Sequence, residues 1–301
     1  MASDSEIFSS TIIPTIGRAT LAAAVASVLE QPFAAAATEV IVVNDSGRPL
    51  PAAAWMESPR VRVITTMKRE RSVARNTGAA IARGRYLHFL DDDDVLLPGA
   101  VQAIYDTAAR DAAAGWIFGS WETVDNNGAV VDRFDPDLNG NIFALLISGE
   151  GLPLQGSFIR ADHFFAVGGF DADPDLTGVE DRDLGRRMAL TGTIAHAAPF
   201  VTRIRIGEAT STTDWSRTAE RDRWGREKAL RLAGVVARAQ ASATSSYWRG
   251  RATRAFVASS QWNLQRGQWL TAMSRLASAV RVAGGFPATG GFWTGLRTKI
   301  R

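Results

Sequence analysis

The stretch YLHFLDDDDVLLP, Tyr86–Pro98, places four consecutive aspartates between two apolar runs. On an extended chain, residues i and i+2 point to the same side, so Asp91 and Asp93 would face one site. Asp92 and Asp94 would then face another. Two carboxylates at the end of a strand suit a hard divalent cation, which also neutralises their mutual repulsion. A solvated acidic turn is the structural alternative, but the apolar residues on both sides favour a metal site.

Patterns typical of strands and helices alternate around this stretch. Apolar or alternating runs predict strands at Phe8–Pro14, Thr38–Asp45, Arg60–Thr66, Arg85–Leu90, 114–125 and 152–160, and a strand pair or bend at 194–206. Helical spacing predicts helices at Ala19–Gln31, at Ser72–Gly84 with Gly84 just after the last turn, and at Gly178–Gly192. This alternation indicates an α/β fold with a doubly wound, mostly parallel, Rossmann-like sheet. Ligands of such sheets bind at the carboxyl ends of the strands.

Charge is distributed unevenly along the chain. Up to Glu220 there are 19 Lys and Arg against 29 Asp and Glu, and from Arg221 onward there are 15 against 2. The pattern after Arg221 is helical throughout, with helices expected near 222–240, 245–265 and 268–283. The sequence therefore predicts a catalytic domain over 1–220 and a basic helical region over 221–301.

Composition excludes several classes of protein. The chain has no cysteine and three histidines, which excludes disulfides and thiolate metal sites and argues against a zinc enzyme. A carboxylate site would instead favour Mn²⁺ or Mg²⁺. No apolar run approaches the roughly 18 residues that a membrane span requires. The start, MASDSEIF, lacks the features of a signal peptide, so we expect a cytoplasmic protein.

Further charged residues lie at predicted strand and helix ends. Asp45 follows the apolar run VIVV, although NDSG is equally suited to a turn. Arg71 and Arg75 share one face at the start of a helix, where backbone N–H groups attract anions such as a diphosphate. A solvated basic face is the alternative. Glu180 and Asp181 begin another helix, where they either stabilise its dipole or supply a general base.

The order of these motifs resembles that of family 2 glycosyltransferases with the GT-A fold. The motifs that carry the resemblance are TIIPTIGR, EVIVVNDSG, RSVARNTGAAIARGRYLHFLDDDDVLLPGAV and VGGFDADPDLTGVEDRDLGRRMALTG, between residues 8 and 192. The resemblance implies transfer of a sugar from a nucleotide-diphosphate sugar, with UDP-sugars favoured, to an acceptor hydroxyl. It also implies inversion at the anomeric carbon and dependence on a divalent metal, Mn²⁺ or Mg²⁺.

The resemblance assigns the nucleotide-binding roles by position. Pro14 and Thr15 would border the nucleotide base, and Asp45 would hydrogen-bond it. Arg71 and Arg75 would approach the base and the diphosphate.

The acidic motifs receive the remaining roles by the same resemblance. Asp91 and Asp93 match its Asp-x-Asp motif, with Asp93 as the direct metal ligand and Asp91 nearer the ribose or a metal-bound water. Asp92 lies between them in the nucleotide-sugar-binding segment. Asp181, in the pair Glu180 and Asp181, matches the catalytic base.

The acceptor side and the diphosphate side are less fully matched. Gly156 and Ser157 fall where the family places acceptor-side backbone. Many members carry a histidine after the final strand, near the metal or the diphosphate. Here that stretch is VTRIRIGEATST, so Arg203 and Arg205 become the candidate diphosphate contacts. His196 comes earlier and is expected within the strand.

Two alternatives remain open from the sequence. FLDDDDVLL also fits the motif of haloacid-dehalogenase-type phosphatases, with Asp91 as the nucleophile, but that motif normally lies on the first strand. A non-catalytic sugar-binding or partner-binding relative of the fold is the other. The complete set of acids, Asp45, Asp91, Asp93 and Asp181, favours an enzyme.

The expected partners follow from the family and from the basic region. The acceptor would be a carbohydrate or a lipid-linked molecule, as in polysaccharide biosynthesis, and no nucleic acid is expected. The aromatic residues of the basic region, among them Phe292 and Trp293, would either pack its helices together and onto the catalytic domain or stand beside exposed arginines. Exposed arginines beside Phe292 and Trp293 would suit an anionic membrane surface. We therefore expect peripheral membrane contact through residues 285–301, on the inner face of the membrane.

Overall fold

The computed structural model describes residues 7–67, 70–206, 215–242 and 246–298. The chain packs into two compact units. The first contains Met1–Leu138, Leu152–Ala172 and Ile194–Thr213, and the second contains Asn139–Gly151, Asp173–Thr193 and Asp214–Arg301. The second unit thus includes two segments that precede residue 220. As a division into domains, 1–220 and 221–301 stays a prediction.

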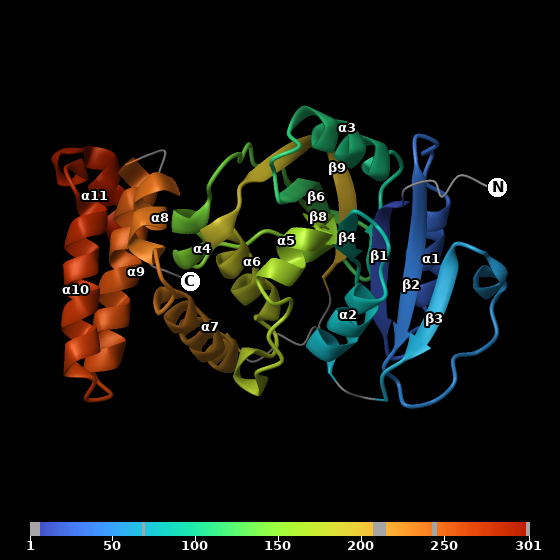
Figure 1. The fold of residues 1–301 in the computed structure, drawn as a ribbon, viewed down its shortest axis with the longest axis horizontal. Helices are drawn as coiled ribbons and strands as arrows, with labels where there is room; N and C mark the ends of the chain where they lie inside the picture. The colour runs from blue at the N-terminus through green and yellow to red at the C-terminus, as the bar shows by residue number, and fades with distance from the viewer. Residues whose placement is uncertain (1–6, 68–69, 207–214, 243–245, 299–301) are drawn as a thin grey trace. The chain divides into compact units, whose positions relative to one another are not determined.

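The first unit is built on one mixed sheet (Figure 1). Among the described residues its strands are β1 (Ile7–Thr15), β2 (Ala37–Asn44), β3 (Val61–Thr65), β4 (Tyr86–Phe89), β5 (Val95–Leu96), β6 (Trp116–Val124), β7 (Val130–Phe134), β8 (Ser157–Arg160) and β9 (Ile194–Arg205). The order is β3-β2-β1-β4-β8-β6-β9-β5, with β7 paired to β6. The strands β3, β2, β1 and β4 run parallel, as does β9 along β6. The strands β8, β7 and β5 are antiparallel to their neighbours.

Helices cover both faces of this sheet, as the predicted doubly wound fold requires. The helices of the first unit are α1 (Leu21–Leu29), α2 (Arg71–Ala80), α3 (Ala100–Arg110) and α5 (Ala161–Ala166), with short 3₁₀ turns η1 (Ala54–Glu57) and η2 (Leu154–Gly156). Successive residues of β1 face opposite sides. Ile13 joins the apolar cluster that contains α1 and α3, whereas Ile12 lies against Gly78 of α2.

One glycine has a different role from the predicted one. The helix expected to end before Gly84 ends earlier, with α2 at Ala80 and its cap at Ile81. Gly84 instead passes against the backbone of β1, where an added Cβ would lie 2.4 Å from the amide nitrogen of Ser10. Its N–H donates to Ser10 Oγ at 2.8 Å. The glycine is required by this close approach.

The second unit is helical in its described part. Its elements are α4 (Phe143–Ile147), η3 (Pro174–Leu176), α6 (Glu180–Thr191), α7 (Trp215–Leu230), α8 (Val235–Ser242), α9 (Ser246–Leu264), α10 (Trp269–Ala283), η4 (Phe286–Ala288) and α11 (Gly290–Arg297). The single helix predicted near 222–240 is wrong, because Gly234 adopts a φ of 76° and separates α7 from α8. The predicted helices near 245–265 and 268–283 correspond to α9 and α10.

Buried charge pairs hold several of these helices together. Asp222 of α7 accepts from Arg186 of α6 at 2.6 Å and from Arg226 at 2.7 Å. Glu227 of α7 accepts from Arg275 of α10 at 2.8 Å. Arg226 and Arg275 are therefore paired with the two acids of the region after Arg221, which still carries a large excess of positive charge. Pairs of this kind fix the register of helices more surely than they add stability.

Candidate active site

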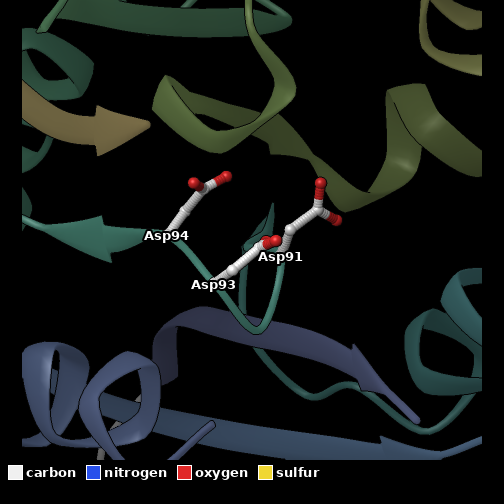
Figure 2. Close-up of side chains that lie close together, drawn as sticks. All are labelled: Asp91, Asp93 and Asp94. Atoms are coloured by element: carbon white, nitrogen blue, oxygen red, sulfur yellow. The ribbon is translucent and has the colours of Figure 1, made fainter. Parts of the chain in front are cut away.

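The four aspartates occupy a turn between β4 and β5. The N–H of Asp94 donates to the carbonyl oxygen of Asp91 at 3.1 Å, so the chain is not extended here. The predicted alternation of faces is therefore wrong for this loop. Asp94 joins Asp91 and Asp93, and one carboxylate oxygen from each lies within 4.8 Å of the others. Figure 2 shows the three side chains gathered around the loop.

Asp92 points away from this group and anchors the loop to the end of β1. Its carboxylate accepts from Thr15 Oγ1 at 2.5 Å and from Arg18 Nη1 at 2.6 Å. The same Arg18 nitrogen lies 3.2 Å from Asp93. Arg18 lies three residues after the end of β1, and nothing in the local pattern of the sequence distinguished it. Its contacts show that the first loop and the acidic loop are joined through charge.

Asp91 is held as an oriented carboxylate. It accepts from Arg75 Nη2 at 2.7 Å and from Gln155 Nε2 at 2.8 Å. Burial alone would raise the pKa of Asp91, but the charge of Arg75, its hydrogen bond and the charge of Arg71 outweigh burial and lower it. Asp91 is therefore ionised at neutral pH.

The other two acids of the group have the opposite tendency. Asp94 is buried. Among the described residues, its carboxylate accepts one hydrogen bond, from the backbone N–H of Arg205 at 2.7 Å. Burial and the charge of Asp91 raise the pKa of Asp94 well above its usual range. Burial also raises the pKa of Asp93, with the charges of Asp91 and Asp92 adding to it against Arg18. A bound cation would remove this repulsion, so the donor set fits a hard divalent ion.

Other predicted residues lie at the same edge of the sheet. Thr15 ends β1, and its carbonyl oxygen accepts from the N–H of Asp45 at 2.8 Å, so the ends of β1 and β2 adjoin. Pro14 lies within β1 opposite Val43. Asp45 accepts from Thr66 Oγ1 at 2.7 Å and from the N–H of Glu70, which caps α2, at 3.1 Å.

Arg71 and Arg75 begin α2, as predicted, but only Arg75 is buried. The guanidinium of Arg75 lies 5.4 Å from the ring centroid of Phe170 and binds Asp91. The charge of Arg71 reaches Asp91 strongly enough to lower its pKa. Both arginines therefore act on the acidic loop.

Gly156 and Ser157 lie where η2 passes into β8. Ser157 is buried, and its hydroxyl donates to the carbonyl oxygen of Pro153 at 2.7 Å. The preceding residue, Gln155, is the one that reaches Asp91. Its carbonyl oxygen is in turn 2.9 Å from Nε2 of the buried His88. No motif of the sequence marks Gln155 or His88 as a site residue.

The two arginines of β9 are engaged elsewhere. Arg203 donates from Nε to Glu122 Oε1 at 2.7 Å. The guanidinium of Arg205 donates to the carbonyl oxygen of Asn126 at 3.2 Å, while its backbone N–H binds Asp94. Contact of either guanidinium with a diphosphate therefore requires these bonds to exchange. His196 lies within β9, as expected, 3.0 Å from Ser120 Oγ.

The predicted catalytic acids belong to the second unit and begin α6. Glu180 is buried and accepts from the N–H of Gly178 at 2.6 Å. Asp181 is partly exposed and accepts from the N–H of Arg182 at 2.8 Å. The neighbouring Asp183 pairs with Arg187, one turn further along α6, at 2.7 Å.

Part of this chain is similar to known glycosyltransferases. Residues 10–136 match the model of glycosyl transferase family 2. Chondroitin synthase from Escherichia coli is 32% identical over 79 residues, which cover 26% of this chain and 12% of that protein. The chain therefore spans about an eighth of the length of that curated relative.

Solved structures of S. aureus TarS share the fold. Residues 1–349 of TarS superpose with a TM-score of 0.59 at 15% identity, covering 92% of this chain and 82% of that chain. The complex of the same fragment with UDP-GlcNAc gives a TM-score of 0.58 at 13% identity, covering 94% and 92%.

The fold of this chain is therefore the one that TarS has. Residues 10–136, less than half of the chain, match the model of glycosyl transferase family 2. The predicted resemblance to family 2 glycosyltransferases and the predicted GT-A-type fold with C-terminal helices are thereby confirmed.

Proposed function

We propose that the protein transfers a sugar from a nucleotide-diphosphate sugar to an acceptor hydroxyl, with inversion and with a divalent metal. The observation that carries the proposal is the acidic group itself. Asp91, Asp93 and Asp94 bring carboxylate oxygens within 4.8 Å of one another at the carboxyl end of β4. Ligands of α/β sheets bind at this edge.

The donor is proposed to be a UDP-sugar. TarS, which shares the fold, has been solved with UDP and with UDP-GlcNAc. In this chain Pro14, Thr15 and Asp45 would border the nucleoside, because they adjoin at the ends of β1 and β2. Arg71 and Arg75 would face the diphosphate from the start of α2.

The metal is proposed to be Mn²⁺ or Mg²⁺, held chiefly by Asp93 with Asp94 and Asp91 beside it. Such an ion, when bound, stabilises the negative charge that develops on the departing diphosphate. Arg75 supports it by keeping Asp91 ionised and oriented. Arg203 and Arg205 stay candidates for a diphosphate contact once their present bonds exchange.

Inversion requires one group to take the proton of the acceptor hydroxyl as that hydroxyl attacks the anomeric carbon. We assign this to Asp181, whose carboxylate is partly exposed at the start of α6. Glu180 is buried and bonded to backbone, so its proposed part is to fix that first turn. The acceptor, a carbohydrate or a lipid-linked molecule, would approach Gly156 and Ser157.

The metal assignment is tested by Asp93→Asn. Calorimetry should show that UDP binding in the presence of Mn²⁺ falls by at least about tenfold, because an amide is a poor ligand for a hard cation. Asp132→Asn, an exposed acid on β7, is the matched control and should bind as the wild type does. Equal affinity of Asp93→Asn and the control would reject the metal site.

The base assignment is tested by Asp181→Asn. Donor binding should stay near that of the wild type while turnover falls about a hundredfold or more, the usual scale for loss of a general base. Asp175→Asn, an exposed acid in η3, serves as the control. Activity above a tenth of the control would leave Asp181 a helix-dipole residue. Absence of turnover with every donor that binds would favour the non-catalytic alternative.

The alternative of a phosphatase with Asp91 as nucleophile is not favoured. The acidic loop follows β4 and not the first strand, and residues 10–136 match a glycosyl transferase model. Asp91 is also engaged by Arg75 and Gln155, which leaves it poorly placed to attack.

A cytoplasmic location and peripheral contact with an anionic membrane through residues 285–301 complete the proposal. Among the described residues, no helix combines the length and the apolar character needed to cross a bilayer. Phe292 is buried, which corrects the expectation that it stands beside exposed arginines, whereas Trp293 is exposed. Trp293 would therefore carry the aromatic contact of this segment.

A further inference from the structure

The helix α10 presents an apolar stripe that no other described element covers. Its exposed members, with their exposed fractions, are Trp269 (67%), Leu270 (89%), Met273 (60%), Leu276 (41%) and Val280 (74%). Trp269, Met273, Leu276 and Val280 are spaced four, three and four residues apart, so they follow one side of the helix.

The opposite side of α10 faces the interior of the second unit. Ala272, Arg275, Ala279 and Val282 are buried there. Arg275 binds Glu227 of α7, and the carbonyl oxygen of Ala272 accepts from Ser260 of α9 at 2.9 Å. The helix is therefore firmly docked by one face, and the apolar stripe is its outer face. A contiguous exposed stripe of large apolar side chains marks an interaction surface.

Charge identifies the kind of partner. After Glu227 the sequence contains ten arginines and two lysines and neither Asp nor Glu. Arg281 in the last turn of α10 and Arg297 in α11 are exposed. The heptad-like spacing would also suit pairing with a second copy of α10. Each copy would bring the exposed Arg281 and no acidic residue of α10 to that pairing, and like charges across an interface are unfavourable.

An anionic lipid surface satisfies both features. Tryptophan favours the boundary between headgroups and acyl chains, and Leu, Met and Val can enter the acyl region. Basic residues beside the stripe gain from the negative surface potential. We propose that α10 lies flat on an anionic membrane, with Leu270, Met273 and Val280 inserted. This surface is separate from Trp293 and does not depend on the sugar-transfer activity.

The first experiment measures co-sedimentation of the full chain with vesicles of phosphatidylcholine and phosphatidylglycerol at 3:1. Leu270→Ser/Met273→Ser should lower the partition coefficient about tenfold or more, since each loses most of the transfer free energy of an apolar side chain. Val130→Ser/Val131→Ser is the matched control, because these two valines of β7 are also exposed. Trp293→Ser tests the 285–301 contact separately.

The second experiment uses the absence of cysteine in the chain. Met273→Cys, labelled with an environment-sensitive nitrobenzoxadiazole probe, should brighten and shift to the blue with the anionic vesicles. The same probe at Asn127→Cys, in the exposed β6–β7 turn, should not change. Vesicles of phosphatidylcholine alone should give a weaker response at residue 273, and 0.5 M salt should reduce the anionic one.

Equal partitioning of the two double variants, or an unchanged probe at residue 273, would overturn the proposal. Equal binding to neutral and anionic vesicles would overturn its charge argument. A dimer in sedimentation velocity that Leu270→Ser/Met273→Ser abolishes, without vesicle binding, would assign the stripe to a second copy instead. UDP binding and turnover, measured in parallel on all variants, should stay at wild-type values, so that failure here leaves the proposed function standing.

Discussion

His88 predicts an acid sensitivity of the first unit that can be worked out from its surroundings. The imidazole is fully buried in β4, and its ring stacks on Phe158 at 4.3 Å between centroids. Nε2 lies 2.9 Å from the carbonyl oxygen of Gln155, which can only accept, so Nε2 carries the proton. Nδ1 then accepts from Thr11 Oγ1 at 3.1 Å. The neutral ring is therefore satisfied at both nitrogens.

Burial lowers the pKa of His88 from 6.5 to about 4, with the bond to Gln155 opposing only part of the effect. The unfolded chain binds this proton near pH 6.5 and the folded chain near pH 4. Between these values the unfolded state holds more protons, so stability present above about pH 6.5 is lost as the pH falls toward 4. From pH 7.5 to 4.5 the loss is about 2.5 kcal/mol for this one group.

The comparison protein is His88→Phe, which keeps a ring against Phe158 and cannot titrate. Its stability at pH 7.5 will be lower, because Thr11 and the carbonyl oxygen of Gln155 lose their partner. The decisive quantity is the stability that each protein loses between pH 7.5 and pH 4.5. Amide exchange of Tyr86–Phe89 should be measured for both proteins at pH 7.5 and 4.5, because it reports the first unit alone.

The wild type should lose about 70-fold more protection than His88→Phe over this range, which is 2.5 kcal/mol at about 1.4 kcal/mol per tenfold. Other groups that titrate, such as Asp94, are common to both proteins and cancel. A difference of less than about threefold would mean that His88 is charged in the folded state or hydrated. The reasoning from burial would then be refuted.

Two further results are expected. Asp94→Asn should raise the melting temperature of the metal-free protein, because it removes a buried like charge beside Asp91, and it should weaken Mn²⁺ binding. Relative to the wild type, the variant should therefore melt at a higher temperature without Mn²⁺ and be stabilised less by added Mn²⁺. A lower melting temperature without Mn²⁺, or an equal stabilisation by Mn²⁺, would contradict this. Gly250→Ala should destabilise the packing of α9 on α11 by about 1–3 kcal/mol, because an added Cβ would lie 2.0 Å from the carbonyl oxygen of Phe292. Gly285→Ala meets nothing within 4 Å and should leave amide exchange of α11 unchanged.

The fold was predictable wherever the local pattern carries the information. Apolar runs with strand and helix periods placed β1, β2, β3, β4, α1 and α2, and these elements bring Thr15, Asp45 and Asp91 to one edge. That convergence follows from topology, because parallel strands share their carboxyl edge. The tail was less predictable. A helical period continues across Gly234, but the structure has a break at 231–234 between α7 and α8, and its last residue, Gly234, has a left-handed backbone.

Parts of the site were not predictable because they depend on contacts distant in sequence. The rule of alternating faces holds for extended chain, and the hydrogen bond between Asp94 and Asp91 shows a turn instead. Gln155 reaches Asp91 across 64 positions of the sequence. Arg203 pairs with Glu122 across 81. The sequence shows that a side chain is charged, but it does not show which distant residue that side chain will bind.

The three carboxylates of the acidic group are not equivalent, and this difference bears on how a cation would be held. Asp91 already receives two side-chain donors, Arg75 and Gln155, which lower its pKa and occupy both of its oxygens. Asp93 and Asp94 have raised pKa values, to which repulsion from Asp91 contributes. A divalent ion therefore gains most from Asp93 and Asp94, whose repulsion it relieves. Asp91 contributes a fixed negative charge that favours the ion, while Arg75 keeps that carboxylate from moving toward it.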